Sequence, residues 1–228
     1  MAVRYDAGMA AAQSVDWSHI DTVLLDMDGT LLDLHFDNHF WLDLVPRHYA
    51  ALNALSIAES HARLGPKFRA VEGTLDWYSI DYWSRELGFD IATVKSDVRD
   101  RVCFQPGAEA FLDQLAALGK RRVLLTNAHP RTLAIKEEQV GLARHFEVMY
   151  STHPFGLPKE HAGFWPRFHE REPFDRSRTL FADDSLPVLR AAHAFRVKWL
   201  RQILCADSTQ PKRAAGEFPA VDYVADLA

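Results

Sequence analysis

The fold is decided by the stretch Thr22-Val23-Leu24-Leu25-Asp26-Met27-Asp28-Gly29-Thr30. Its first four residues are apolar or β-branched and stop abruptly at Asp26, which is typical of a buried strand that ends at a polar loop. Two carboxylates two positions apart at a strand end project to the same side. Because such charges repel each other, we expect a cation beside them, and Mg²⁺ suits oxygen ligands of this kind. Taken alone, the stretch is also compatible with a simple turn capped by an Asp side chain.

The apolar pattern of this strand returns along the chain. Similar runs occur at residues 122–125, 179–181 and 197–200, and residues 147–150 are a further candidate for a short strand. Between them lie segments with helical spacing at 107–118, 130–140 and 186–194. Strands that alternate with helices favour a parallel sheet covered on both faces. The sequence therefore predicts an α/β fold with a Rossmann-like three-layer core, and ligands in such sheets bind at the carboxyl ends of the strands.

Residues 34–105 break this rhythm because they contain no convincing strand. Ile80, Trp83 and Leu87 keep helical spacing, while Gly65-Pro66 and Gly88 punctuate the segment. We interpret it as a small all-helical cap inserted after the first strand. The remaining residues, 1–33 and 106–228, then form the α/β core.

Length and composition exclude several classes of protein. The 228 residues are 48% hydrophobic and 25% charged, which excludes a disordered or fibrous chain. A formal net charge of −5 argues against a nucleic-acid polymer as partner. No apolar run approaches the ~18 residues that cross a bilayer, and residues 1–18 lack the apolar stretch of a secretory signal. Cys103 and Cys205 are far apart and show no metal or disulfide spacing, which fits a cytoplasmic location.

Further polar residues follow the predicted strands, and each has an ordinary explanation. Thr126 and Asn127 can hold a phosphate oxygen or cap the next helix. Lys159, placed after Pro158, is either an aimed positive charge or a solvated surface lysine. Asp183 and Asp184 either complete a cation site or cap a helix N-terminus. The occurrence of all these residues in this order, most of them at strand ends, favours a shared site.

This order resembles the haloacid dehalogenase superfamily of phosphohydrolases. Asp26-Met27-Asp28-Gly29-Thr30 matches its first motif, Thr126 the second, Lys159 the third and Asp183-Asp184 the fourth. The resemblance implies that Asp26 is the nucleophile that forms an aspartyl-phosphate. It also implies that Asp28 is the general acid and base. The cap position, between the first and second motifs, also matches the superfamily.

The same resemblance implies the ligands of phosphate and metal. Thr126, Asn127 and Lys159 would bind the phosphoryl oxygens. Mg²⁺ would be held by Asp26, by the backbone carbonyl of Asp28 and by Asp184, with Asp183 beside them and steering Lys159. The dehalogenases of this superfamily lack a carboxylate at the position of Asp28. The resemblance therefore implies a phosphatase that acts on a small phosphomonoester.

Phrases in the cap and around the strand ends are similar to the bacterial GMP/IMP 5′-nucleotidase subgroup. They include Phe36-Asp37-Asn38-His39-Phe40-Trp41 and Leu75-Asp76-Trp77-Tyr78-Ser79. Helical spacing would place Tyr78, Asp81 and Tyr82 on one face, where an aromatic ring stacks a purine and a carboxylate accepts from its N–H. The alternative is that this face only packs inside the cap.

Two other functions remain open at this point. A phosphatase for sugar phosphates or other small metabolites would use the same core residues, so only the cap distinguishes it. A non-catalytic interaction protein on the same fold is the second, although Asp26, Asp28, Lys159 and Asp184 are all present. The sequence leaves the oligomeric state undetermined.

Overall fold

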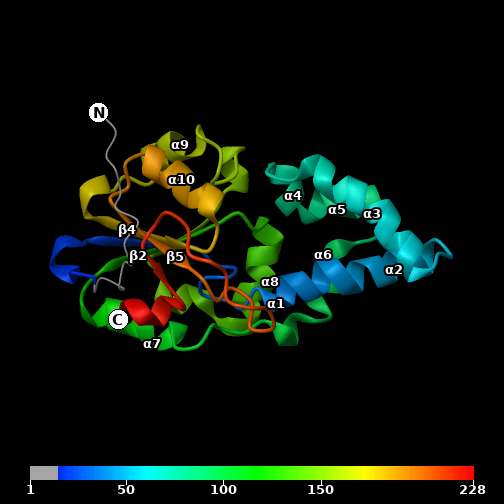
Figure 1. Ribbon diagram of the computed structural model, residues 1–228, viewed down its shortest axis with the longest axis horizontal. Helices are drawn as coiled ribbons and strands as arrows, with labels where there is room; N and C mark the ends of the chain where they lie inside the picture. The colour runs from blue at the N-terminus through cyan, green and yellow to red at the C-terminus, as the bar shows by residue number, and fades with distance from the viewer. Residues whose placement is uncertain (1–14) are drawn as a thin grey trace.

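A computed structural model describes residues 15–228 and shows one sheet of parallel strands (Figure 1). The strand order is β3-β2-β1-β4-β5-β6, and every neighbouring pair is parallel. The strands are β1 (Thr22–Leu25), β2 (Arg121–Thr126), β3 (Val148–Ser151), β4 (Thr179–Asp183), β5 (Trp199–Ile203) and β6 (Ala220–Val221). The predicted α/β class is confirmed. Most of the residues before the first strand that we interpreted as a lead-in, 1–14, lie outside the described residues.

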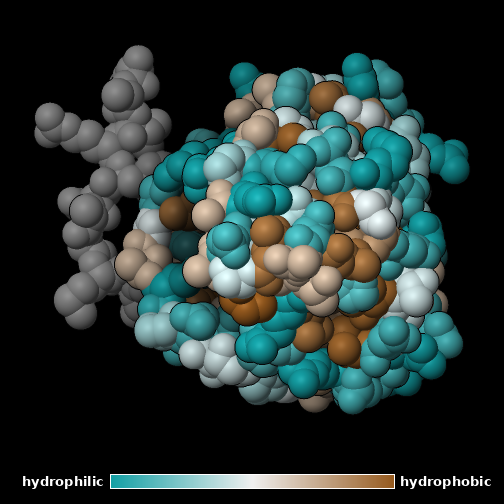
Figure 2. Space-filling view, turned by 90° about the vertical axis from the view of Figure 1, so that its right-hand side faces the viewer, coloured by the Kyte–Doolittle hydropathy of each residue, from teal (hydrophilic) through white to brown (hydrophobic). Residues whose placement is uncertain are grey.

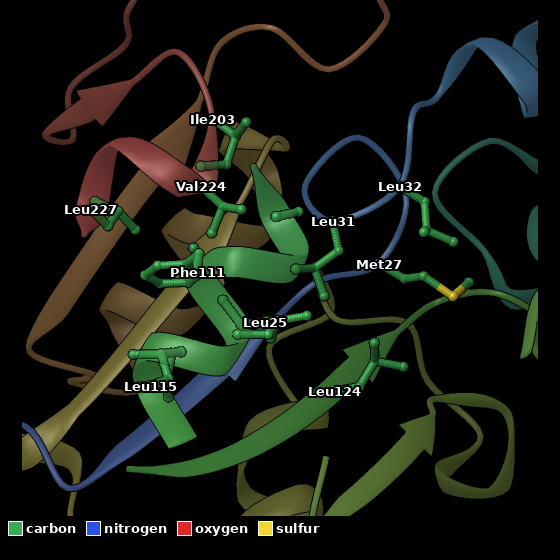
Figure 3. Close-up of a cluster of buried hydrophobic side chains, with 14 of the residues drawn as sticks. Leu25, Met27, Leu31, Leu32, Phe111, Leu115, Leu124, Ile203, Val224 and Leu227 are labelled. Atoms are coloured by element: carbon green, nitrogen blue, oxygen red, sulfur yellow. The ribbon is translucent and has the colours of Figure 1, made fainter. Parts of the chain in front are cut away.

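Helices cover both faces of the sheet, as the three-layer prediction requires (Figure 1). They are α7 (Ala108–Ala117), α8 (Pro130–Val140), α9 (Phe164–Arg171) and α10 (Leu186–Ala194). Successive strand residues point to opposite faces. Leu25 therefore joins a cluster with Phe111 and Leu115 of α7 (Figure 3), whereas Leu24 joins a second cluster with α9 and α10.

The chain between β1 and β2 folds into helices. They are α1 (His35–His39), α2 (Val45–Leu52), α3 (Ile57–Val71), α4 (Leu75–Tyr78), α5 (Ile80–Leu87) and α6 (Ile91–Ser96), with a π-helical segment, η2 (Phe40–Leu44), joining α1 to α2. These helices lie together at one end of the molecule (Figure 1). They enclose a third hydrophobic cluster built around Phe40, Leu64, Ile80 and Trp83.

Local sequence explains where two of these helices begin. Ser56 and Glu59 form a capping box at the start of α3, in which each side chain accepts from the other's backbone N–H. Ser79 adopts an extended backbone and its hydroxyl accepts from the N–H of Tyr82, so it ends α4 and starts α5. The helical face predicted from Tyr78 to Tyr82 is therefore interrupted.

The two chain crossings between the sheet and these helices lie side by side. The N–H of Asp33 donates to the carbonyl of Cys103 at 3.0 Å, and the N–H of Gln105 donates to that of Leu31 at 2.8 Å. Leu32 and Phe104 form an isolated β-bridge between the same two segments. The two chain crossings thus form one narrow covalent connection between the helical segment and the core.

The surface at the helical end is mixed in character. Apolar side chains gather there among polar ones (Figure 2). Leu42, Leu52 and Ile57 are its most exposed large apolar residues, at 62%, 57% and 43%. No helix within residues 15–228 is long and apolar enough to span a membrane.

Candidate active site

The predicted site residues gather at the carboxyl ends of three adjacent strands. Asp26 directly follows β1, Thr126 is the last residue of β2, and Asp183 is the last residue of β4. Because β2, β1 and β4 are neighbours in a parallel sheet, these ends share one edge. Asp26, after β1, thus lies in the middle of this edge, with Thr126 of β2 on one side and Asp183 of β4 on the other.

A cavity of about 710 Å³ opens between this edge and the helical segment. Its volume lies in the range of small-molecule sites, roughly 300–1,000 Å³. The core contributes polar and charged side chains, namely Asp26, Asp28, Thr126, Asn127, Lys159, Asp183, Asp184 and Arg213. The helices contribute mostly apolar and aromatic ones, among them Leu34, Trp41, Leu42, Phe68, Trp77, Ile80 and Trp83.

Lys159 is the positive centre of the core part of the site. Its ammonium group contacts the Asp26 carboxylate and donates to Asp183 Oδ2 at 2.7 Å and to the carbonyl of Leu125 at 3.1 Å. Although burial opposes its charge, the Asp183 and Asp26 carboxylates hold the pKa of Lys159 above its usual value. Lys159 is therefore a fixed cation beside the Asp26 carboxylate. Its contact with Asp183 holds the ammonium group in that position.

The loop that carries Lys159 is held by Asn127. Asn127 Oδ1 accepts from the backbone N–H of Lys159 at 2.9 Å and from the Thr152 hydroxyl at 3.2 Å, while its Nδ2 donates to Glu160 at 2.9 Å. The Asn127 side chain, which we predicted to bind phosphate, is thus bound to the protein. The Thr126 hydroxyl is buried at the strand end and accepts from the N–H of Ala128 at 3.0 Å.

Three carboxylates at this edge are close enough to hold a cation. One oxygen each of Asp26, Asp183 and Asp184 lie within 4.8 Å of one another. Burial raises the pKa of all three carboxyls, because crowded negative charge is costly away from water. Gly29 has a φ of +82°, and a Cβ there would lie 2.8 Å from Asp184 Oδ2, so only glycine lets the loop approach this carboxylate. Hard oxygen donors of this kind fit Mg²⁺.

Asp28 lies apart from this cluster and belongs to a second charged network. Its carboxylate contacts the ammonium of Lys136 on α8, which also donates to Asp37 Oδ2 on α1 at 2.5 Å. Asp37 Oδ1 in turn accepts from Lys95 of α6 at 2.6 Å. The Lys136 and Lys95 side chains are only 1% and 2% exposed. We call Asp28, Lys136, Asp37 and Lys95 the border network, because it joins the core to the helical segment.

The charges of the border network support one another. Despite burial, Lys136 and Lys95 lower the pKa of Asp37 to about 2. Burial raises the pKa of Asp28, and Lys136 opposes that effect. The Lys95 ammonium also lies 4.7 Å from the centre of the Phe40 ring, a cation–π contact. Sequence reasoning missed Lys136, Asp37 and Lys95 because each is a single charge on a helix, and a single lysine usually indicates a solvated surface.

Arg213 is a further charged residue that the sequence did not indicate. It lies in the loop between β5 and β6, and its guanidinium donates to Asp184 Oδ2 at 2.5 Å. Its side chain is 44% exposed, so it covers the solvent side of the acidic cluster. No short motif marks this position, because the loop reaches the site only through the fold.

The structure separates the three cap residues that we expected on one face. Tyr78 lines the cavity, and its hydroxyl donates to Glu160 of the core at 2.9 Å. Asp81 is 49% exposed, does not line the cavity, and pairs with Arg131 at 3.0 Å. Tyr82 packs against Trp83 within the hydrophobic cluster of the helical segment. The expectation of a shared face is corrected here, because Ser79 splits the helix between Tyr78 and Asp81.

The parallel sheet carries a buried lysine and several carboxylates at the C-terminal ends of its strands. This arrangement is typical of an α/β enzyme whose active site is rich in acidic residues. A family model described as haloacid dehalogenase-like hydrolase matches residues 20–196, and the chain belongs to this family. The chain is also 41% identical over 211 residues to the GMP/IMP nucleotidase YrfG of Escherichia coli (strain K12), covering 92% of this chain and 95% of that protein.

Solved structures share the fold. A HAD phosphatase from Thermococcus onnurineus superposes with a TM-score of 0.74 at 17% identity, covering 91% of this chain and 96% of that one. CbbY from Rhodobacter sphaeroides, solved in complex with phosphate, gives a TM-score of 0.63 at 15% identity, with the same coverage. At such identities the likeness shows the fold alone.

Proposed function

We propose that this protein is a Mg²⁺-dependent phosphomonoester hydrolase that acts on purine nucleoside 5′-monophosphates, with GMP and IMP preferred. The observation that carries the phosphatase chemistry is the position of Asp26 at the centre of the cavity, with the Lys159 ammonium against its carboxylate. The nucleotide preference rests on the 41% identity to a GMP/IMP nucleotidase across nearly the whole chain.

The residues of the cavity account for the chemistry in two steps. In the first, an Asp26 oxygen attacks phosphorus, the bond from phosphorus to the ester oxygen breaks, and Asp28 gives its proton to that leaving oxygen. In the second, Asp28 takes a proton from water as the water oxygen attacks phosphorus and the bond from phosphorus to the Asp26 oxygen breaks, which releases phosphate and restores the Asp26 carboxylate. Lys159 stabilises negative charge on the phosphoryl oxygens throughout, from a buried and preorganised position.

Asp26 and Asp184, with the backbone carbonyl of Asp28, would hold Mg²⁺, and Asp183 would stay beside them on Lys159. When bound, Mg²⁺ neutralises charge between the anionic nucleophile and the anionic substrate. Thr126 would bind a phosphoryl oxygen at the end of β2. Asn127 would support that role by fixing the loop that carries Lys159.

We further propose that residues 34–105 form a cap domain that closes over this site. Its support is the narrow connection at Asp33 and Gln105 and the separate hydrophobic cluster inside the segment. Closure would exclude bulk water from the reaction. The cavity wall that the cap supplies would then select the part of the substrate beyond the phosphate.

The test is the rate of phosphate release from a panel of substrates. GMP, IMP, AMP, UMP and glucose 6-phosphate are compared by kcat/KM in excess Mg²⁺ and in EDTA. We expect GMP and IMP to exceed the others and EDTA to stop the reaction, with activity restored by added Mg²⁺. If AMP or glucose 6-phosphate is hydrolysed as fast as GMP, the nucleotidase proposal fails while the phosphatase proposal stands. If EDTA leaves the full rate, the metal proposal fails.

A further inference from the structure

The cap wall of the cavity presents aromatic rings to the space above the phosphate site. Trp41, Phe68 and Trp77 line the cavity and are each partly exposed. Their rings make edge-to-face contacts around Phe68, with centroids 6.2 Å from Trp41 and 6.1 Å from Trp77. The ring of buried Trp83 also packs edge-to-face on Phe68, with centroids 4.9 Å apart. Such a wall can pack against the flat face of a nucleobase.

Most polar side chains on the cap side of the same cavity are already bound within the protein. Asp37 and Lys95 belong to the border network. Asn38 donates to Asp207 at 2.6 Å, and the Tyr78 hydroxyl donates to Glu160. These groups hold the cap and the core together, so they are not available to recognise a base without breaking a contact.

Glu72 differs from all of them. It is the residue that follows α3, it lines the cavity, and its side chain forms no hydrogen bond or ion pair with any residue in the range 15–228. It also comes four positions after Phe68, which places the carboxylate one helical turn beyond an aromatic ring. Phe68 and Glu72 thus line the same cavity, and Glu72 is exposed to solvent rather than bound within the protein.

We propose that Glu72 is the residue that recognises the base, accepting a hydrogen bond from the N1–H of a 6-oxopurine. This proposal rests on the proposed nucleotidase function. Guanine offers a second donor, its 2-amino group, so the carboxylate can accept from both. Adenine presents a lone pair at N1, which faces a negative oxygen and repels it. Glu72 and Asp26 line one cavity, so on this proposal the base and the phosphate of one nucleotide lie within the same space.

The test compares substitutions of cap carboxylates. Glu72→Gln keeps the shape of the side chain but removes its charge and lets it donate to adenine N1. We expect it to lower the ratio of kcat/KM for GMP to that for AMP by about 10- to 100-fold, the span of a hydrogen bond to a charged group. Glu86→Gln is the matched control, because Glu86 pairs with Lys67 on the cap surface and does not line the cavity.

Two further measurements distinguish an error in the role of Glu72 from an error in the proposed function. Hydrolysis of p-nitrophenyl phosphate, which has no base, should be unchanged in Glu72→Gln, which excludes general damage to the site. If the GMP to AMP ratio survives in Glu72→Gln, or collapses in Asp81→Asn instead, the assignment to Glu72 is overturned. If the wild-type protein itself shows no preference for GMP over AMP, the proposed nucleotidase function has failed rather than the role of Glu72 within it.

Discussion

The candidate active site and its border contain two buried lysines. Each contacts two carboxylates, but the two sets of carboxylates come from different parts of the fold. Lys159 sits between Asp26 and Asp183, all three at the carboxyl edge of the sheet. Lys136 sits between Asp28 and Asp37, and its network crosses from the core into the cap. Each lysine neutralises two carboxylates away from water. The carboxylates around Lys159 come from the ends of β1 and β4, whereas three of the four residues in the border network come from helices.

That difference explains which network the sequence could predict. Strand ends bring Asp26 and Asp183 to one edge of the sheet, so their positions follow from strand pattern alone. Lys136, Asp37 and Lys95 come from three helices that meet only when the cap packs on the core. In the proposed mechanism the first network serves the chemistry, whereas the second connects Asp28 to the helices of residues 34–105. Mutations should separate these two roles.

The largest expected effect comes from Asp26 in the first network. Asp26→Asn should lower kcat for GMP on the order of 10⁴-fold or more while the protein stays folded, because the nucleophile is lost. Circular dichroism and urea unfolding check the fold. Retention of more than a trace of wild-type activity would show that Asp26 is not the nucleophile.

Asp28 provides the paired comparison within the same prediction. Asp28→Asn should lower kcat for GMP by roughly 10²–10⁴-fold, the range for a general acid and base. The loss should be smaller with p-nitrophenyl phosphate, whose leaving group needs little protonation. Equal losses with both substrates would contradict the role of Asp28 as the acid.

The next effect concerns stability and tests the border network. Lys136→Met keeps an apolar stem but leaves the Asp28 carboxylate without its cation and Asp37 with Lys95 as its remaining partner. Breaking a buried pair on one side should lower the free energy of unfolding by about 3–5 kcal/mol. Lys67→Met is the control, because its pair with Glu86 is about 40% exposed and such pairs contribute ~0–1 kcal/mol. Urea denaturation measures both variants. A Lys136→Met variant no less stable than Lys67→Met would show that the border network does not hold the cap.

The comparison also shows how far the sequence specifies this fold. The runs at 122–125 and 179–181 became β2 and β4, because a short apolar run that stops at a polar residue is typical of a buried strand. Strand β6 was not predicted, since Ala220 and Val221 are too short to show a pattern. Helix α9 was also missed, although Phe164, Trp165 and Phe168 are buried against the sheet. Short elements depend on tertiary packing more than on their own residues.

The same limit applies to the site. Asp26, Asp183 and Asp184 could be predicted to meet because parallel strands align their ends, whereas Lys159 lies in a loop and was placed with them only by the family resemblance. Arg213 could not, since it reaches Asp184 from a loop whose path depends on β5 and β6. The predicted face of Tyr78 and Asp81 failed for a local reason, because one serine competes with the helix for backbone hydrogen bonds. Glu72 emerges only from knowing which cap residues are already paired.

The smallest expected effect distinguishes the two networks by pH. Burial raises the pKa of Asp184 to about 6, with the Asp26 charge adding to the effect. The folded protein therefore takes up a proton at Asp184 as the pH falls through about 6, and that proton competes with Mg²⁺. Asp37 behaves in the opposite way, because its pKa of about 2 lies below the ordinary value of 3.8. Its contribution to stability is present above about pH 3.8 and is lost only near pH 2.

Between pH 7.5 and 5.5 the cluster of Asp26, Asp183 and Asp184 should thus lose negative charge, while Asp37 stays ionised. The dissociation constant for Mg²⁺, measured by calorimetry on metal-free protein, should rise by at least about fourfold. The proton at Asp184 alone accounts for that factor, and Asp26, whose pKa burial raises to about 7, adds to it. Asp81→Asn is the control and should keep this response, since Asp81 lies outside the cavity. An Mg²⁺ affinity that is equal or higher at pH 5.5 would mean that Asp184 is not among the ligands, or that Arg213 keeps its carboxylate ionised. Repeating the titration with Arg213→Gln separates these explanations, because removing the guanidinium should move the loss of affinity to higher pH only if Asp184 binds the metal.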